Sequence, residues 1–257
     1  MIVSDDQGYA DLGCCGRPEL VSPNLDRLAA EHTRNRLLCR LAGLHPSRGA
    51  LLTGRYPQRN GLYDMIRNDV ADFKVTFTDQ EYAVTPEAIL GLDERETVIA
   101  EVLKKAGYAT GVVGKWDSGQ LRRFRPTQRG FDFFYGFCNT GVDYWTHERY
   151  EYPSMWRNNE RIVEDGYITD LFEREALGFL RAHADERFFL YLPFNAPHGG
   201  SNFSSPARRQ SRSTSSSTAA CPAASASTTW APSLRWMSQS APSSNCSNSR
   251  AVSTTRS

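Results

Sequence analysis

The chain has 257 residues, 40% of them hydrophobic, which is enough to bury the core of one large domain or two smaller ones. Its net charge of +1 hides an uneven distribution, because residues 201–257 contain six Arg and no Asp, Glu or Lys. The remaining 24 Lys and Arg against 29 Asp and Glu give residues 1–200 a net charge of −5. An acidic body argues against a nucleic-acid partner, and no apolar run approaches the roughly 20 residues of a membrane span. The six cysteines include no Cys-x-x-Cys pair, so the sequence predicts neither a disulfide framework nor a zinc site.

Helices and strands are predicted to alternate along most of the chain, with polar residues after each strand. Apolar runs predict buried strands that carry Asp5, Asp6, Lys115 and His198 in the loops at their carboxyl ends. This pattern is typical of an α/β domain whose ligands bind beyond the carboxyl edge of the sheet. The predicted elements are a strand over 2–3, helices over 24–29, 47–53 (ending at Gly54) and 97–106 (ending at Gly107), a strand over 109–113, a helix over 170–182 and a strand over 188–194.

Residues 201–257 depart from this pattern. They are about one-third serine, contain no carboxylate and show no apolar periodicity. Such a segment cannot bury enough apolar surface to offset the entropy lost on ordering, so we expect this tail to be disordered. A natural linker and a frameshifted segment both agree with the composition.

Four motifs occur in an order that carries a family resemblance. They are Asp-Asp-Gln-Gly at 5–8, Pro-Ser-Arg at 46–48 running into Leu-Thr-Gly-Arg at 52–55, Gly-Lys-Trp at 114–116, and Asn-Ala-Pro-His-Gly at 195–199. Together they resemble the formylglycine-dependent (type I) sulfatases. The segments 143–149 and 166–170 resemble the arylsulfatase B-like, N-acetylgalactosamine sulfatase-like branch, which acts on sulfated amino sugars.

The resemblance implies the alkaline-phosphatase-like sulfatase fold, an α/β domain with a mixed sheet flanked by helices. We expect residues 1–200 to be a truncated, amino-terminal part of the catalytic domain, with residues 32–45 garbled. The first strand has only two residues and no signal peptide precedes it, so we expect the start of the sequence to cut into that strand. Residues 201–257 would then be a low-complexity Ser/Arg tail.

Leu44 stands where the family has its key cysteine. In the motif Cys-x-Pro-Ser-Arg the cysteine is oxidised to formylglycine, the nucleophile. Leucine cannot undergo this oxidation, so we expect the chain as written to be inactive. A frameshift is one explanation, because with permitted codons for residues 36–45 a neighbouring frame spells TDFYVGWPACT ahead of Pro-Ser-Arg. Permitted codons for residues 230–256 likewise let a neighbouring frame spell an amphipathic helix resembling one that sulfatases carry.

Asp5 and Asp6 are the candidate metal ligands. Paired carboxylates at the end of a strand suit a hard divalent cation, although Asp-Asp-x-Gly is also an ordinary turn. The resemblance implies Ca²⁺ as the cofactor. It also implies further carboxylate and amide ligands, which lie in a part of the family sequence that this chain does not carry.

Four positions besides Leu44 are candidate catalytic positions. The resemblance implies that Arg48 orients the formylglycine, that Lys115 binds a sulfate oxygen as a point charge, and that His198 contacts the sulfate ester. Each also has an ordinary interpretation, as a solvated cation or a structural His after a strand. Asp117 stands where the family has a second His, and a carboxylate cannot protonate a leaving oxygen at neutral pH unless its pKa is strongly raised.

We expect Asp5, Asp6, Arg48, Lys115 and His198 to converge on one pocket, since the loops after parallel strands meet at one edge of a sheet. Arg48 is expected to join them less reliably, because it follows the garbled segment. His147 is either substrate-side or structural. Arg125 and Arg129 could contact an anionic sugar, or they could be ordinary solvent-exposed arginines.

The resemblance predicts a sulfuric ester hydrolase, an arylsulfatase or carbohydrate sulfatase, whose partner is a sulfated carbohydrate or an aryl sulfate. The alternative is a non-catalytic protein that binds sulfated ligands, because Lys115 and His198 are present without the nucleophile. A phosphoesterase of the same superfamily would require Ser or Thr at position 44. The nucleotide sequence around codons 32–46 separates the first two, since compensating insertions and deletions indicate a corrupted sulfatase. We expect the intact protein to be periplasmic, lysosomal or secreted.

Overall fold

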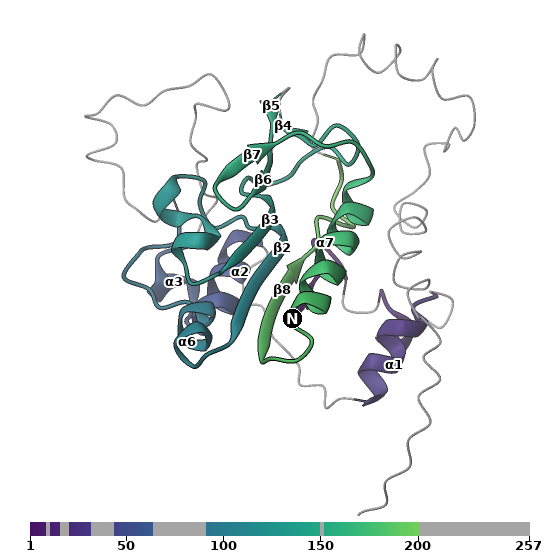
Figure 1. Cartoon of the computed structure of the whole chain (residues 1–257), viewed down its shortest axis with the longest axis horizontal. Helices are drawn as coiled ribbons and strands as arrows, with labels where there is room; N and C mark the ends of the chain where they lie inside the picture. Colours follow the sequence, from purple (N-terminus) through teal and green to yellow (C-terminus); the bar gives the residue numbers. More distant parts are fainter. Residues whose placement is uncertain (9–10, 16–20, 32–43, 64–90, 150–151, 201–257) are drawn as a thin grey trace, which may run out of the picture.

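A computed structural model describes residues 1–8, 11–15, 21–31, 44–63, 91–149 and 152–200. Within them, six strands form one sheet in the order β1-β8-β2-β3-β6-β7, and helices lie on both sides of it (Figure 1). The α/β class with a mixed sheet flanked by helices, predicted from the sequence, is therefore confirmed. The tail and most of the garbled patch lie outside the described residues, so their predicted disorder and garbling stay predictions.

Four parallel strands form the centre of the sheet. They are β1 (Ile2–Val3), β8 (Phe188–Pro193), β2 (Ala109–Lys115) and β3 (Phe133–Phe137). Strands β2, β3 and β8 consist almost entirely of apolar residues and glycine, as expected for parallel strands that are covered on both faces. Their carboxyl ends lie side by side, and the candidate site is at this edge.

Two antiparallel strands extend the sheet beyond β3. These are β6 (Met155–Arg157) and β7 (Glu160–Ile162), which are joined by a two-residue turn. Asn158 in this turn has a φ of 54°, a conformation that asparagine tolerates better than most residues. A separate two-stranded sheet pairs β4 (Glu148–Arg149) with β5 (Tyr152–Pro153). The sequence analysis did not identify β3 or these four short strands.

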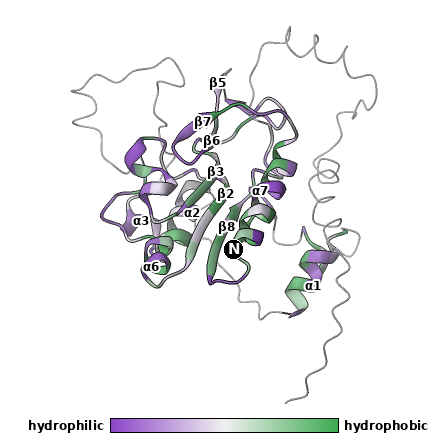
Figure 2. Cartoon of the chain, viewed as in Figure 1, coloured by the Kyte–Doolittle hydropathy of each residue, from purple (hydrophilic) through white to green (hydrophobic). Residues whose placement is uncertain are grey.

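One face of the sheet packs against α7 (Ile168–Ala182). Phe172, Ala176 and Phe179 of this helix are buried with residues of four strands, including Val113 and Leu190. These helix positions recur every three or four residues, as the amphipathic pattern predicted. Figure 2 shows hydrophobic residues along β8, beside helices that carry both hydrophobic and hydrophilic residues.

The other face packs against α2 (Leu44–Thr53) and α6 (Ile99–Lys105). Leu52 and Ala100 from these helices are buried with Val112, Phe134 and Tyr191 from the strands. Val112 and Val113 therefore point to opposite faces, because successive side chains of a strand alternate. The result is a three-layer arrangement with two apolar clusters, one on each side of the sheet.

The remaining described helices are short or peripheral. They are α1 (Pro23–Glu31), α3 (Pro57–Asn60) and the 3₁₀ helices η1 (Gly13–Cys15), η3 (Arg122–Phe124) and η4 (Pro126–Gln128). The glycines expected to end α2 and α6, Gly54 and Gly107, have φ values of 67° and 79°, which glycine adopts without strain. Across the described ranges, the helices are too short or too polar to cross a membrane.

Candidate functional site

Lys115, the last residue of β2, occupies the centre of a buried charged cluster. Its side chain is 1% exposed, and its Nζ donates a hydrogen bond of 2.7 Å to Asp5 Oδ2 and lies 3.3 Å from Asp117 Oδ2. Gly114 precedes it with a φ of 130°, and a Cβ there would collide with the carbonyl oxygen of Pro193. Glycine is thus required for β8 to approach β2 this closely beside Lys115.

Asp5 lies directly beneath Lys115 and is fully buried. Its backbone N–H donates to the carbonyl oxygen of Ala196 at 3.0 Å, so the loops after β1 and β8 are tied together. Burial raises the pKa of the Asp5 carboxyl above its ordinary value, while the positive charges of Lys115 and Arg48 oppose that rise. Two strand-end loops therefore place one carboxylate against one ammonium group.

Arg48 enters the cluster from α2 and is 2% exposed. Its Nη1 donates to the carbonyl oxygen of Lys115 at 2.9 Å and to Tyr191 Oη at 3.4 Å. Its Nη2 lies 3.8 Å from Asp5 Oδ1. Neither Nε nor Nη2 has a hydrogen-bond partner within the described part of the chain. Arg48 is thus a buried cation with donors left over.

Asp117 completes the cluster two residues after β2. It is fully buried and has a φ of 53°, a left-handed conformation in which aspartate is commoner than most residues. With Asp5, Arg48 and Lys115 it makes two carboxylates and two cations, which balance in formal charge. The position at which the family has a His is therefore part of the site geometry, although the residue is different.

His198 and Asp6 lie at the margin of the cluster. His198 Nε2 is 3.9 Å from Asp6 Oδ2, and the two side chains are 28% and 59% exposed. The carbonyl oxygen of His198 accepts a hydrogen bond of 2.6 Å from Tyr144 Oη. These two residues therefore face solvent, whereas Asp5, Lys115 and Arg48 do not.

The structure brings Asp5, Arg48, Lys115 and Asp117 together and places Asp6 and His198 at the margin. That these residues form one catalytic pocket stays a prediction. Arg48, which was expected to join the other residues less reliably, contacts Asp5 and the backbone of Lys115, because α2 packs against the sheet. The sequence analysis missed Tyr191 and Tyr144, which contact Arg48 and His198 through their hydroxyl groups. Their only sequence signal was position, since Tyr191 lies in the strand leading to His198 and Tyr144 in the segment 143–149.

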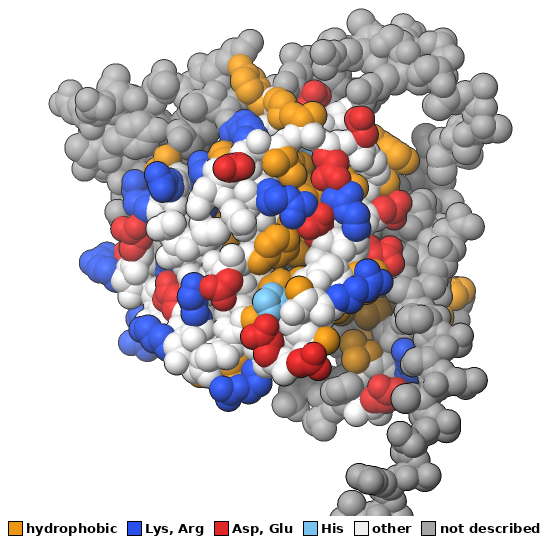
Figure 3. Space-filling model, viewed as in Figure 1, with side chains coloured by type: hydrophobic (Ala, Val, Ile, Leu, Met, Phe, Trp, Pro, Cys, Tyr) orange, Lys and Arg blue, Asp and Glu red, His pale blue; other side chains and the backbone are white. Residues whose placement is uncertain are grey.

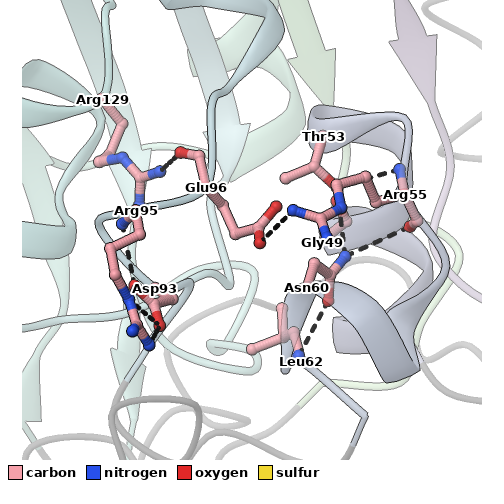
Figure 4. Close-up of polar contacts among 9 residues, drawn as sticks. All are labelled: Gly49, Thr53, Arg55, Asn60, Leu62, Asp93, Arg95, Glu96 and Arg129. Atoms are coloured by element: carbon pink, nitrogen blue, oxygen red, sulfur yellow. Dashed lines mark hydrogen bonds and ion pairs between the residues drawn. The ribbon is translucent and has the colours of Figure 1, made fainter.

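Of the two arginines left open in the sequence analysis, Arg129 is buried and Arg125 is half-buried. Arg129 is 2% exposed and donates to the carbonyl oxygens of Leu92 at 2.7 Å and Glu96 at 2.6 Å, the second of which is drawn in Figure 4. Arg125 lies over the ring of Trp156, 3.9 Å from its centroid, and donates to a backbone carbonyl. His147 is 3% exposed, with Nε2 2.9 Å from the carbonyl oxygen of Gly166. These contacts indicate structural roles for all three.

The described residues do not make a complete calcium site. Asp5 Oδ2 is already bound to Lys115, and Asp6 is exposed. Ca²⁺ takes six to eight oxygen ligands. Among the described residues, no group of three or more His, Cys, Asp or Glu side chains is arranged to hold a metal ion. Two carboxylates alone are too few, so no chemical step can be assigned to a metal here.

Leu44 is the first residue of α2 in the structure, four positions before Arg48. The cysteine position of the predicted motif therefore lies at the start of the helix that delivers Arg48 to the cluster. No side-chain geometry is described for Leu44.

The buried cations and aspartates lie at the carboxyl edge of the sheet, which is where α/β proteins bind their ligands. A family model described as "Sulfatase" matches residues 1–253. The chain belongs to the sulfatase family. Human N-acetylgalactosamine-6-sulfatase is 33% identical over 219 residues, a match that covers 77% of this chain and 39% of the human protein.

Solved structures agree in fold. Ps i-CgsB in complex with k-i-k-neocarrahexaose aligns with a TM-score of 0.61 and 30% identity, covering 77% of this chain and 44% of that one. The structure of BT4656 in complex with its substrate D-glucosamine-2-N,6-O-disulfate aligns with a TM-score of 0.55 and 27% identity, covering 77% and 34%. The chain therefore spans about two fifths of the length of its curated relatives.

Proposed function

We propose that the buried cluster binds the sulfate group of a sulfuric ester, and that the complete protein is a sulfuric ester hydrolase acting on carbohydrate. The observation that carries this proposal is Arg48, whose Nε and Nη2 lack hydrogen-bond partners in the described structure although the side chain is buried. A buried donor without an acceptor costs about 1–3 kcal/mol. A sulfate oxygen beside Arg48 and Lys115 would supply the acceptor.

The surface charge indicates that an anion would be bound by a few particular side chains and not by a broad basic surface. On the face drawn in Figure 3, acidic and basic side chains of the described residues are interspersed. A broad basic field would attract any polyanion, whereas this cluster pairs its two cations with two carboxylates and leaves the unused Nε and Nη2 donors of Arg48 for one small anion. Buried charge–charge hydrogen bonds are also stronger than those in water.

The proposed roles follow the geometry. Lys115 binds a sulfate oxygen as a point charge, Arg48 orients the group at the nucleophile position, and His198 contacts the ester from the exposed margin. Asp117, which stands where the family has a His, would protonate the leaving oxygen at neutral pH only if its pKa were strongly raised. Leu44 cannot form the formylglycine nucleophile, so we propose that this chain binds without turnover.

The proposed cofactor of the complete site is Ca²⁺. Asp5 and Asp6 would be two of its ligands, because they are the carboxylates that follow β1 at the carboxyl edge. The other ligands would come from sequence outside the described residues. We further propose a lysosomal, periplasmic or secreted setting for the complete protein, as the family resemblance implies.

The proposed substrate class is a sulfated amino sugar. Support comes from the name of the human relative, N-acetylgalactosamine-6-sulfatase, and from the substrate in the BT4656 structure, a sulfated glucosamine. A non-catalytic binder of the same sugars is the second candidate, and the absence of the cysteine at Leu44 favours it for this chain. Both candidates require the same sulfate contacts from Arg48 and Lys115.

Turnover and modification separate the two candidates. We expect the purified chain not to hydrolyse 4-methylumbelliferyl sulfate above a heat-denatured control. Leu44→Cys restores Cys-His-Pro-Ser-Arg, and co-expression with a formylglycine-generating enzyme should then yield an aldehyde at position 44, detected by mass spectrometry of the tryptic peptide. Turnover by the unmodified chain would contradict the inactive assignment. Failure of N-acetylgalactosamine 6-sulfate to bind the wild-type chain would reject the sulfate site itself.

A further inference from the structure

Three aromatic rings lead from the candidate site to solvent. Tyr144 donates its hydroxyl hydrogen to the carbonyl oxygen of His198 at 2.6 Å. Its ring stacks on Tyr167 with centroids 5.6 Å apart and an interplanar angle of 17°, and Trp145 lies against the same Tyr167 ring at 5.2 Å. We call Tyr144, Tyr167 and Trp145 the aromatic stack. Burial raises the pKa of the Tyr144 phenol above its ordinary value.

The loop that carries Trp145 is held rigidly. Asp143 Oδ1 accepts the backbone N–H groups of both Trp145 and Thr146 at 2.8 Å. The buried His147 ring lies 2.9 Å from the carbonyl oxygen of Gly166, which ties this loop to the one before α7. The backbone N–H of Ile168 donates to the carbonyl oxygen of Tyr144 at 2.9 Å. The stack is thus pre-organised by contacts from both loops.

Trp145 is nevertheless 66% exposed. A large aromatic side chain fixed in solvent beside a polar site is a common feature of ligand-binding surfaces. A stable protein interface buries roughly 1,200–2,000 Å², whereas the stack presents one indole ring with two tyrosines behind it. One indole matches the size of one pyranose ring, whose C–H groups pack on aromatic faces.

We propose that the aromatic stack is a sugar subsite that holds the pyranose ring next to the sulfated residue of an oligosaccharide. This inference rests on the proposed function, because the subsite is defined by its continuity with the sulfate site through Tyr144 and His198. It adds a preference for oligosaccharides over sulfated monosaccharides. The sulfated residue occupies the cluster, and its neighbour packs against Trp145.

The test is calorimetric titration of the full 257-residue chain with three probes. These are N-acetylgalactosamine 6-sulfate, a tetrasaccharide that carries this residue at one end, and the same tetrasaccharide without sulfate. We expect Trp145→Ala to weaken binding of the sulfated tetrasaccharide about tenfold and to leave the monosaccharide unchanged. Trp145→Phe should retain most of the affinity. Tyr56→Ala, at another exposed aromatic (64%) outside the stack, is the matched control and should change nothing.

The outcomes separate this inference from the proposed function. If Arg48→Ala abolishes sulfated-sugar binding but Trp145→Ala has no effect on the tetrasaccharide, the subsite is wrong and the sulfate site stands. If the unsulfated tetrasaccharide binds equally well and only Trp145→Ala weakens it, the subsite stands and the sulfate site is wrong. A dimer of the wild-type chain that Trp145→Ala dissociates would also overturn the subsite, because a second copy would then cover the stack.

Discussion

Two arginines, Arg48 and Arg129, are equally buried at 2% exposure but differ in how their donors are used. Arg129 donates Nη1 and Nη2 to two carbonyl oxygens and Nε to Glu101 Oε1 at 3.2 Å. Arg48 uses only Nη1 for hydrogen bonds within the described residues, and its Nη2 lies 3.8 Å from Asp5 Oδ1. The Pro-Ser-Arg motif predicts a role for Arg48 and the sequence leaves Arg129 open, but it does not show that both side chains are buried.

The difference teaches how a structural cation is distinguished from a functional one. A guanidinium whose donors all meet protein acceptors has nothing left for a ligand, and its role is to join the segments that supply those acceptors. One that is buried with donors unused retains the capacity to bind an anion. Arg129 joins the loop before α6 to the sheet, while Arg48 faces the charged edge.

The largest loss in free energy of unfolding should come from Arg129→Ala. Its removal leaves the carbonyl oxygens of Leu92 and Glu96 unpaired in the core, and breaking a buried charged contact of this kind costs about 3–5 kcal/mol. Urea unfolding followed by circular dichroism measures the loss. Arg122→Ala, at an exposed position of η3, is the control and should stay within about 0.5 kcal/mol of wild type. An equally small loss for Arg129→Ala would show that its hydrogen bonds are not structural.

Arg48→Ala should lower the free energy of unfolding less than Arg129→Ala does. It should, however, weaken the binding of sulfate. It leaves the carbonyl oxygen of Lys115 without its donor, which predicts a loss of about 1–3 kcal/mol. Sulfate should raise the melting temperature of the wild-type chain, because a ligand that binds only the folded state stabilises it, and this rise should vanish in the variant. The comparison between the two arginines would fail if Arg48→Ala kept the full sulfate-induced rise.

The smallest loss of stability should come from Glu175→Gln, which removes the carboxylate that two arginines share. Arg157 and Arg174 both donate to Glu175. Burial alone would raise the pKa of Glu175, but these hydrogen bonds outweigh it and hold the pKa below its ordinary value. Partly exposed pairs contribute about 0.2–1 kcal/mol, which sets the expected cost of Glu175→Gln at pH 7.

The pH dependence of that cost follows from the sign of the shift. A carboxyl whose pKa is lower in the folded state stabilises the fold above its unfolded pKa, about 4.3. The contribution is lost as the pH falls through the folded pKa. Wild type and Glu175→Gln should therefore differ in stability at pH 7 and converge as the pH falls from about 4.3 through the lower, folded-state pKa. A difference that grows on acidification would contradict the assigned direction.

Much of the fold was predictable because local signals agreed with it. The apolar runs of β2 and β8, and the periodic apolar residues of α7, specify elements that the structure contains. The hairpin of β6 and β7 was missed because it is short and carries Arg157 and Glu160, which do not alternate as a half-buried strand should. Strand β3 was missed as well, since five residues of Phe, Tyr and Gly give no period.

The site was predictable where the ends of parallel strands determine the positions of its residues. Asp5 and Lys115 are 110 residues apart, yet both follow parallel strands, and the ends of such strands meet. The burial of Arg129 was not predictable, because its acceptors at Leu92 and Glu96 lie in a loop without a sequence signature. The contact of Tyr144 with His198 depends equally on a loop that no periodicity places.

The most direct test of the sulfate site is calorimetric titration of sodium sulfate into the wild-type chain and into Lys115→Met. Lys115 Nζ is the point charge of the cluster, and hydrogen bonds to charged groups contribute about 1.5–3 kcal/mol. We therefore predict that Lys115→Met binds sulfate at least tenfold more weakly than wild type, while Lys104→Met, at a half-exposed lysine of α6, binds as wild type does. Circular dichroism confirms that each variant is folded. Equal sulfate affinity of wild type and Lys115→Met would contradict the account.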